Sequence, residues 1–368
     1  MAVYKHIISV LLKALMLSGL VFLAACAKNA EPENEHISFK IANPDGWNEI
    51  TRGAELTNTS IRTEGFGIFA YHTETSVWNP TQHSVPDFMN NTKVTYSGGA
   101  WSYTPLKYWP HNQSEKVSFF AYAPHVVGQS ITGSTLAFQV AQEIDNQIDL
   151  SWSSNETINL NKNTSVVEFA FKHALARIGF TVKVDVDGAS PIPATVEFRI
   201  KNVTAGFDLD PSDSQQEGFY TQGNLNLHNT ADVPEWTDKS GYCSFSLAPR
   251  HFVGGDIEGF ALTDENTAQA QKLNADNAYI MVIPQDFGTN GFNISVEYEV
   301  ILTEKNGHEY QRYTQTGRGV VKTDLEAGKT YTINITTGIS KSSVELISIT
   351  KWENGGEVLI SNIVPDIV

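Results

Sequence analysis

Cysteine is almost absent from this chain, which has two in 368 residues, Cys26 and Cys243. Two cysteines allow one disulfide at most, and no Cys or His cluster has the spacing of a zinc site. The sequence therefore predicts no disulfide framework, no metal and no cofactor. Cys243 lies in an alternating strand pattern, which favours a small core residue over a reactive thiol.

Basic residues are also scarce, with 25 Lys and Arg against 41 Asp and Glu and a net charge of −16. Nucleic-acid binding depends on basic patches that displace counterions from phosphates, so the sequence argues against a nucleic-acid partner. The acidity instead favours a protein that stays soluble while it is exposed.

Catalytic motifs are missing as well. The sequence has no Gly-rich phosphate loop, no HExxH, no GxSxG elbow and no nucleophile with a base at motif spacing. His173 is a candidate base, but no motif places an acid or a nucleophile beside it. We interpret it as a hydrogen-bonded histidine at a domain junction. The sequence predicts no catalytic residue and no enzyme, although groups distant in sequence can converge in space.

An N-terminal export signal is present. Two lysines precede the apolar residues 14–25, the profile of a secretory signal peptide. At about 12 residues the segment is short of the roughly 20 that span a bilayer, so a retained anchor is the weaker alternative. The Leu23–Cys26 motif places Cys26 at the new N-terminus, which predicts a lipoprotein that carries palmitate on Cys26. Removal of residues 1–25 deletes two lysines and no acid, so the net charge becomes −16 − 2 = −18.

A tether and a first strand follow. Residues 27–35 are polar and acidic, which is typical of a flexible tether. Residues 37–41 alternate apolar with polar side chains and predict a strand with one buried face. Arg52 and Gly53 then lie in a polar stretch, where a protease can draw an exposed arginine into its cleft. The alternative for Arg52 is a solvated surface side chain.

Short runs of aromatic and β-branched residues, bounded by Gly, Pro, Asn or Ser, recur along the chain. No segment before residue 150 has a helical period, so the pattern predicts an all-β sandwich or barrel. The polar residues 153–165 predict a linker between two domains, and residues 172–177 predict a single helical turn. The predicted strands are 37–41, 65–71, 93–96, 101–103, 117–122, 196–200, 278–283, 293–300 and 329–335.

Two further segments are candidates for binding. Trp101, Tyr108 and Trp109 lie in the densest aromatic segment and are candidates for stacking on a sugar ring, although the core of a sandwich is favoured for such rings. At the C-terminus, residues 344–352 and 358–364 form two apolar strand-like runs. Such a tail must bury itself on its own domain or on the open sheet edge of another subunit.

Taken in order, these segments resemble the fimbrillin family, the subunits of type V pili of Bacteroidota. Each motif is short, and the specificity lies in the series, which covers nearly the whole chain. The resemblance is carried by Cys26, Thr51-Arg52-Gly53, Gly65–Tyr71, Tyr108-Trp109-Pro110, Phe119–Pro124, Phe171–Ile178, Ile283-Pro284-Gln285, Gly328–Tyr331 and Trp352.

The resemblance implies two transthyretin-like β-sandwich domains with Greek-key connections. An Arg-specific protease is then expected to cut after Arg52, with Arg62 as a second candidate, and to remove the first strand. A terminal strand of another subunit would fill the groove that is left. The expected parts are a signal peptide (1–25), a tether with the removable strand (26–52), two sandwiches (53–158 and 159–338) and a strand tail (339–368). The expected donor residues are Val344, Leu346, Ile347, Ile349, Trp352, Val358 and Ile360.

The sequence therefore predicts a structural subunit of a surface pilus that supports adhesion. Its expected partners are other pilus subunits, the Arg-specific protease, the outer membrane through lipid on Cys26, and host or bacterial surface ligands. Its expected location is the cell surface, first as an outer-membrane lipoprotein and then in a fimbrium. The alternatives are an adhesive tip or anchor subunit and a monomeric glycan-binding lipoprotein.

Overall fold

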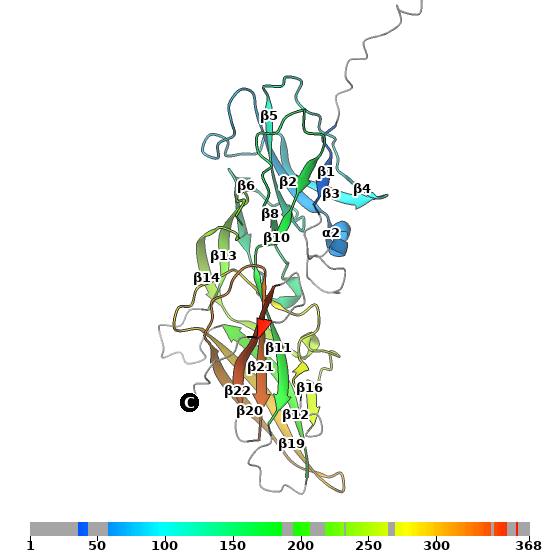
Figure 1. Cartoon of the computed structure of the whole chain (residues 1–368). Coiled ribbons are helices and arrows are strands. Elements are labelled where there is room, and N and C mark those ends of the chain that lie inside the picture. Colours follow the sequence, from blue (N-terminus) through cyan, green and yellow to red (C-terminus); the bar gives the residue numbers. More distant parts are fainter. Residues whose placement is uncertain are drawn as a thin grey trace, which may run out of the picture.

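The structure is a computed structural model that describes residues 36–42, 58–185, 194–206, 218–231, 233–263, 269–339, 342–351 and 358–359. The molecule is elongated, with most strands of the first 173 residues toward one end and most later strands toward the other (Figure 1). Strands dominate throughout, so the all-β class that the sequence predicts is confirmed.

The first part of the chain forms ten strands, one short α-helix and one 3₁₀ turn. They are β1 (Phe39–Ile41), α2 (Asn58–Glu64), β2 (Phe66–Thr73), β3 (Met89–Ser97), β4 (Ala100–Ser102), β5 (Lys116–Ala123), β6 (Ile131–Thr132), β7 (Thr135–Gln139), η1 (Ile144–Asn146), β8 (Ser151–Ser153), β9 (Val167–Phe169) and β10 (Phe171–His173).

The second part adds thirteen strands and another 3₁₀ turn. They are β11 (Ala176–Val184), β12 (Ala194–Gly206), β13 (Phe219–Asn226), β14 (Trp236–Cys243), β15 (Phe245–Leu247), η2 (Pro249–His251), β16 (Phe260–Thr263), β17 (Gln271–Lys272), β18 (Ile280–Val282), β19 (Phe292–Glu304), β20 (Glu309–Val321), β21 (Lys329–Thr337), β22 (Ser343–Lys351) and β23 (Val358–Leu359).

Two local predictions need correction. Helix α2 lies in a region where the sequence shows no helical period, and Ile61 of its short apolar face is buried. The expected helical turn at residues 172–177 is absent, because β10 runs to His173 and β11 starts at Ala176. The side chains of Phe171 and Ile178 are fully buried on these strands, so packing overrides the local helix propensity.

The first part packs an aromatic core beneath a six-stranded sheet with the order β10-β8-β5-β2-β3-β4. A separate two-stranded ribbon of β1 and β9 faces that core, which contains Phe66, Phe119 and Phe169. Residues 153–165 run beside this sheet, since Leu160 pairs with Val117 of β5. The strands after them, β9 and β10, still pair with β1 and β8.

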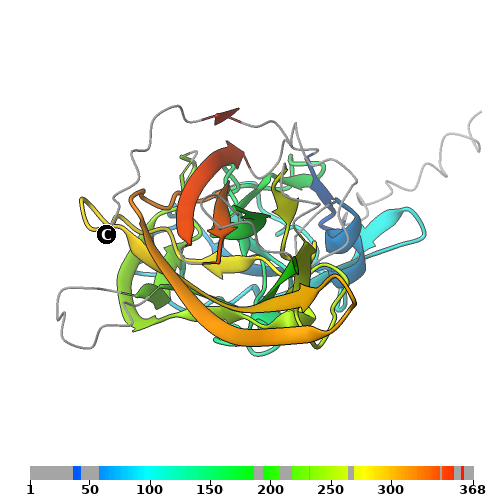
Figure 2. The same cartoon turned by 90° about the horizontal axis from the view of Figure 1, so that it is seen from below.

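The second part is a two-layer sandwich. One layer has the order β17-β11-β21-β22-β23, with β18 also paired to β11. The other has the order β15-β12-β19-β20, with β16 paired to β12. Figure 2 shows the long β19 and β20 (orange) across the molecule from β22 (red). Alternation along β19 explains its position, because Ile294, Val296 and Tyr298 face the core and are at most 1% exposed.

A four-stranded sheet with the order β14-β13-β7-β6 joins the two parts, because β13 pairs with both β14 and β7. The Trp152 indole also donates a 3.2 Å hydrogen bond to the carbonyl of Asn229. One continuous hydrophobic core therefore extends from Phe69 to Leu346. The proposed division at residues 158 and 159 stays a prediction.

The packing of β2 against β5 generates a stability prediction. A methyl group at Gly67 would lie 2.6 Å from Cζ of the fully buried Tyr122 ring, closer than real contacts allow. We expect Gly67→Ala to lower the free energy of unfolding by about 1–3 kcal/mol, measured by urea denaturation. The double variant with Tyr122→Leu should lose less than the sum of the single variants, because the smaller side chain vacates the contested space. Additive losses would contradict this packing.

Candidate functional site

The short strand β1 is held along both of its edges. On one side it runs parallel to β9, where the Val167 amide donates to the Ser38 carbonyl at 2.9 Å and the Ala42 amide to the Phe169 carbonyl at 2.8 Å. On the other side the Ile37 amide donates to the Lys107 carbonyl at 2.8 Å. The strand thus completes the backbone hydrogen bonding of two segments that are far from it in sequence.

The apolar side chains of this segment cover the aromatic core. Ile37 is fully buried and Phe39 is 6% exposed. The Phe39 ring centroid lies 5.1 Å from Tyr103, 5.8 Å from Phe119 and 5.7 Å from Phe169. Its neighbour Lys40 points to the surface and pairs with Glu168 at 2.9 Å, as the alternating pattern requires.

Tyr103 fixes the segment from the other side. Its hydroxyl donates a 2.7 Å hydrogen bond to the Ile37 carbonyl. Burial raises the pKa of Tyr103, so the hydroxyl stays protonated and remains a donor at neutral pH. We call Tyr103, Lys107, Phe119, Val167 and Phe169 the β1 seat.

The geometry of the β1 seat suits the binding of an extended strand. Each large apolar side chain that leaves it gives up about 1.5–3 kcal/mol of burial. Departure of β1 would also leave the Val167 amide and the Lys107 carbonyl without these partners, and an unmet buried group costs about 1–3 kcal/mol. An empty seat would therefore favour another strand with two alternating apolar side chains.

The C-terminal candidates begin in β22, which lies antiparallel to β21 of its own chain. Leu346 is 4% exposed, while Val344, Ile347 and Ile349 are partly buried. Strand β23 pairs with β22 through Val358 and Leu359. Trp352 and Ile360 lie outside the described residues. Donation of these residues to another subunit stays a prediction.

Of the candidate residues for lipidation and proteolytic processing, only Arg62 lies within the described residues. Cys26, Arg52 and Gly53 lie outside the described residues. Arg62 lies in α2, where its exposed guanidinium is 5.0 Å from the Tyr96 ring centroid. The buried Ile61 beside it ties this helix to the core, so a protease would have to unwind the helix to reach an extended Arg62.

The aromatic candidates do not form a flat exposed row. Trp109 is 6% exposed and meets Phe119 edge to face at 5.9 Å, so its ring faces the core. Trp101 is partly buried between Phe66 and Tyr96, each at 5.1 Å. Tyr108 is 49% exposed, and its backbone forms a bridge with His36. This geometry favours the core role over sugar stacking for the two tryptophans.

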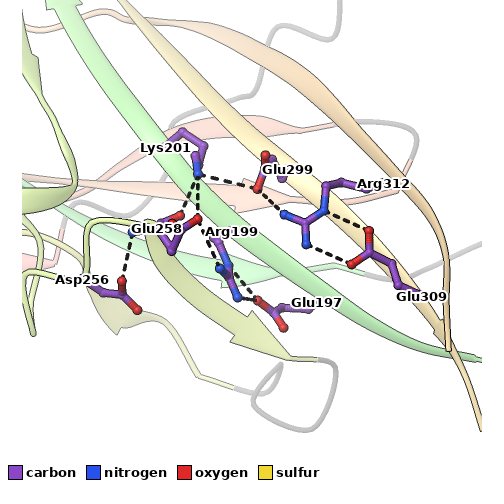
Figure 3. Close-up of polar contacts among 8 residues, drawn as sticks. All are labelled: Glu197, Arg199, Lys201, Asp256, Glu258, Glu299, Glu309 and Arg312. Carbon is purple, nitrogen blue, oxygen red and sulfur yellow. Dashed lines mark hydrogen bonds and ion pairs between the residues drawn. The ribbon is translucent and has the colours of Figure 1, made fainter. Parts of the chain in front are cut away.

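Charged side chains gather on the face of the sandwich that β12, β19 and β20 form (Figure 3). Lys201 lies 3.6 Å from Glu299, which is 3.3 Å from Arg312. Arg312 in turn binds both oxygens of Glu309, and these hydrogen bonds lower the pKa of Glu309. These cations and carboxylates are paired with one another, so the cluster cross-links strands and leaves no charge poised for chemistry.

The candidate base His173 is paired with an acid. His173 Nδ1 lies 2.8 Å from an Asp149 oxygen and both side chains are at most 2% exposed, so the predicted hydrogen-bonded role of His173 is confirmed. Within the described ranges no group of three His, Cys, Asp or Glu side chains is placed to hold a metal ion. The same ranges contain no helix of the length and apolarity that a membrane crossing needs.

Strand β1 is predictable from the sequence, but the β1 seat is not. Tyr103 and Lys107 lie 66 and 107 − 37 = 70 residues from Ile37, to which they bind, and no local signal links them. Strand β20 is not predicted from the sequence either, because its mostly exposed residues alternate only weakly between apolar and polar. The one available signal there was the pair Gly317 and Gly319, because glycines in a strand often mark a close backbone approach.

Comparisons with known proteins agree with this fold. Residues 51–352 match the family profile described as Fimbrillin-like. The fimbrium subunit Fim1C of Phocaeicola vulgatus is 32% identical over 328 residues, which cover 78% of this chain and 81% of that relative. The crystal structure of a fimbrial protein from Bacteroides vulgatus matches with a TM-score of 0.64 at 21% identity, covering 87% of this chain and 100% of that one.

The fold and the site define an all-β protein whose first described strand closes an apolar groove. The length of the family match and the identity to Fim1C identify it further: the chain belongs to the fimbrillin-like family. The resemblance drawn from the sequence is confirmed, and family membership supports the predicted role as a subunit of a pilus.

The β1 seat generates a prediction about local stability. We expect Phe39→Ala to weaken the binding of β1 by about 3–5 kcal/mol, because the substitution leaves a cavity among three aromatic rings. Hydrogen exchange of the amides of residues 37–42, followed by mass spectrometry, measures this loss. Lys40→Ala is the matched control, with an expected loss below about 1 kcal/mol. Equal exchange rates in both variants would contradict the role of Phe39.

Cys243 generates a second prediction. The side chain is partly buried against the core, and burial raises its pKa to about 11. At pH 8 the thiolate fraction is then about 100-fold below that of an ordinary thiol, and the higher nucleophilicity of a more basic thiolate recovers about 10-fold. We expect alkylation by iodoacetamide to be about 10-fold slower in the folded protein than in urea. Equal rates would show an open, unperturbed thiol.

Proposed function

We propose that this chain is a structural subunit of a surface pilus that polymerises by β-strand complementation. The observation that supports this most directly is the β1 seat, in which a removable three-residue strand covers Phe119 and Phe169. A strand of another subunit that presents apolar side chains at alternate positions suits the same seat. Association with other pilus subunits follows from family membership.

The maturation that we propose begins with export as a lipoprotein. Signal peptidase removes residues 1–25, and lipid on Cys26, palmitate included, anchors the precursor in the outer membrane. An Arg-specific protease then cuts between Arg52 and Gly53 and releases β1 with the tether. We favour Arg52 over Arg62 because Arg62 lies in a helix whose neighbouring Ile61 is 1% exposed.

The proposed location is therefore the cell surface, first as a precursor and then in a fimbrium that supports adhesion to host or bacterial surfaces. The proposed role needs no catalysis. The driving force is the burial of apolar side chains together with the pairing of backbone groups that cleavage leaves open. A tip or anchor subunit would share the β1 seat, but it would differ in whether it is cut or donates a strand.

Substitution of the two candidate arginines tests the processing step. In the cells that make the pilus, we expect Arg52→Ala to leave a precursor that retains β1 and gives no ladder of polymers on a non-denaturing gel. Intact mass and N-terminal sequencing of the surface protein identify the cut. Arg62→Ala is the matched control and should begin at Gly53 and polymerise normally.

Normal assembly of the Arg52→Ala protein would overturn the assignment of Arg52. A wild-type chain that keeps lipid on Cys26 and forms no ladder would instead identify an anchor subunit or a monomeric lipoprotein. A chain that begins at residue 63 would move the cut to Arg62.

A further inference from the structure

The inner face of β20 contacts the chain just after the end of β21. Tyr313, Gln315, Gly317 and Gly319 alternate along β20 and therefore project from the same face of the strand. Together with Tyr298 of β19 they lie against residues 338–339, which follow β21, and against residues 342–344 at the start of β22. We call these five residues the tail clasp.

Three polar side chains of the tail clasp hold the backbone at the start of this segment. The Tyr298 hydroxyl is 1% exposed and lies within hydrogen-bond distance of two acceptors, the Gly338 carbonyl at 2.9 Å and Gln315 Oε1 at 2.6 Å. The Gln315 amide donates to the Ile339 carbonyl at 2.7 Å. The Tyr313 hydroxyl donates to the same carbonyl at 3.3 Å. The bond to Gly338 is buried and the two bonds to Ile339 are partly buried, so each group that lost its partner would carry a desolvation penalty.

The two glycines of the tail clasp make room for β22 itself. A Cβ atom added at Gly319 would lie 2.7 Å from Cβ of Val344, and one added at Gly317 would collide with the Ser342 side chain. Side chains of any size at these positions would push β22 off the opposite layer. The glycines therefore allow the close approach of β22, which is a common reason for glycine within a strand.

Strand β22 is also bound far more extensively than β1. It pairs with β21 from Ser343 to Lys351 and buries Leu346, whereas β1 spans three residues. Removal of β22 would open this ladder and expose Leu346. It would also displace the carbonyls of Gly338 and Ile339, to which Tyr298 and Gln315 are hydrogen-bonded. A donor strand that must leave its own domain gains little if it first gives up such contacts.

From these contacts we infer that the tail clasp retains β22 as a permanent strand of its own domain during assembly. Val344, Leu346, Ile347 and Ile349 are then not donor residues, and any donated strand lies outside β22. The inference rests on the proposed strand complementation and divides the predicted donor segment at the end of β22. The strand that leaves is β1, and the strand that stays is β22.

Two engineered disulfides test the inference. Thr332→Cys with Ser348→Cys joins β21 to β22 at positions that face each other in the ladder, in a Cys243→Ser background that removes the free thiol of the described residues. Facing residues of antiparallel strands have Cα separations of about 4.5–5.5 Å, within the range of a disulfide. Thr336→Cys with Ser343→Cys is a second lock at the other end of β22.

The matched control locks the strand that we expect to leave. Lys40→Cys with Glu168→Cys joins β1 to β9 at facing positions in the same Cys243→Ser background. Each full-length precursor is purified oxidised, its disulfide is verified by peptide mapping, and it is treated with an Arg-specific protease with and without reductant. Polymer ladders on a non-denaturing gel are the readout, and circular dichroism verifies that each variant is folded.

We expect the β22 locks to polymerise within about twofold of wild type whether oxidised or reduced. The inference is overturned if the oxidised β22 locks give no ladder and reductant restores it, because β22 would then have to leave. The β1 lock tests the proposed function separately. Its oxidised form should give no ladder until reductant is added, and free polymerisation of that form would overturn strand complementation at the β1 seat.

Discussion

The contact on which the rest depends is that of Phe39 with the rings of Tyr103, Phe119 and Phe169. These rings form a core that a six-stranded sheet covers on one side and the two-stranded ribbon of β1 and β9 covers on the other. A strand of three residues contributes few backbone hydrogen bonds, so its apolar side chains supply most of its binding free energy. Closure of this core is therefore local and depends on a few side chains.

This weak closure contrasts with the long strands of the second part. Strands β12, β19 and β20 each span 13 residues, and their registers pair along almost their full length. Opening a sheet of that kind disrupts many hydrogen bonds at once, whereas β1 can detach without opening any other strand pair in the described structure. The fold thus combines long, extensively paired strands with one short strand that has a single strand partner.

Much of the architecture follows from local side-chain pattern. Residues 37–41 predict a strand because apolar and polar side chains alternate, whereas residues 65–71 and 117–122 predict strands because they are short runs of aromatic and β-branched residues. Both faces of these two runs are buried in the structure. The helical turn at residues 172–177 was wrong because burial of Phe171 and Ile178 outweighs a propensity of a few tenths of a kcal/mol per residue. Strand β20 escaped prediction because its polar residues carry little amphipathic contrast.

The site was predictable only in part, for a related reason. The apolar face of β1 can be recognised from the five consecutive residues 37–41. Its seat includes Tyr103, Lys107 and Val167, which only the folded chain brings together. The tail clasp is similar, since Gln315 of one layer of the sandwich donates a hydrogen bond to Ile339, which follows a strand of the other layer. Local pattern identifies which strand has an apolar face, and tertiary packing decides which groove receives it.

Charge sets a further constraint on assembly. Subunits of net charge −16 repel one another, so association in a polymer cannot depend on long-range attraction between whole chains. The ion-paired face of β12, β19 and β20 limits this repulsion locally, because Lys201 and Arg312 are placed among the carboxylates that surround them. Salt at physiological concentration screens the remainder beyond about 8 Å. The free energy of association must then come from short-range contacts, and the proposed pairing of an incoming strand at the aromatic β1 seat would supply contacts of this kind.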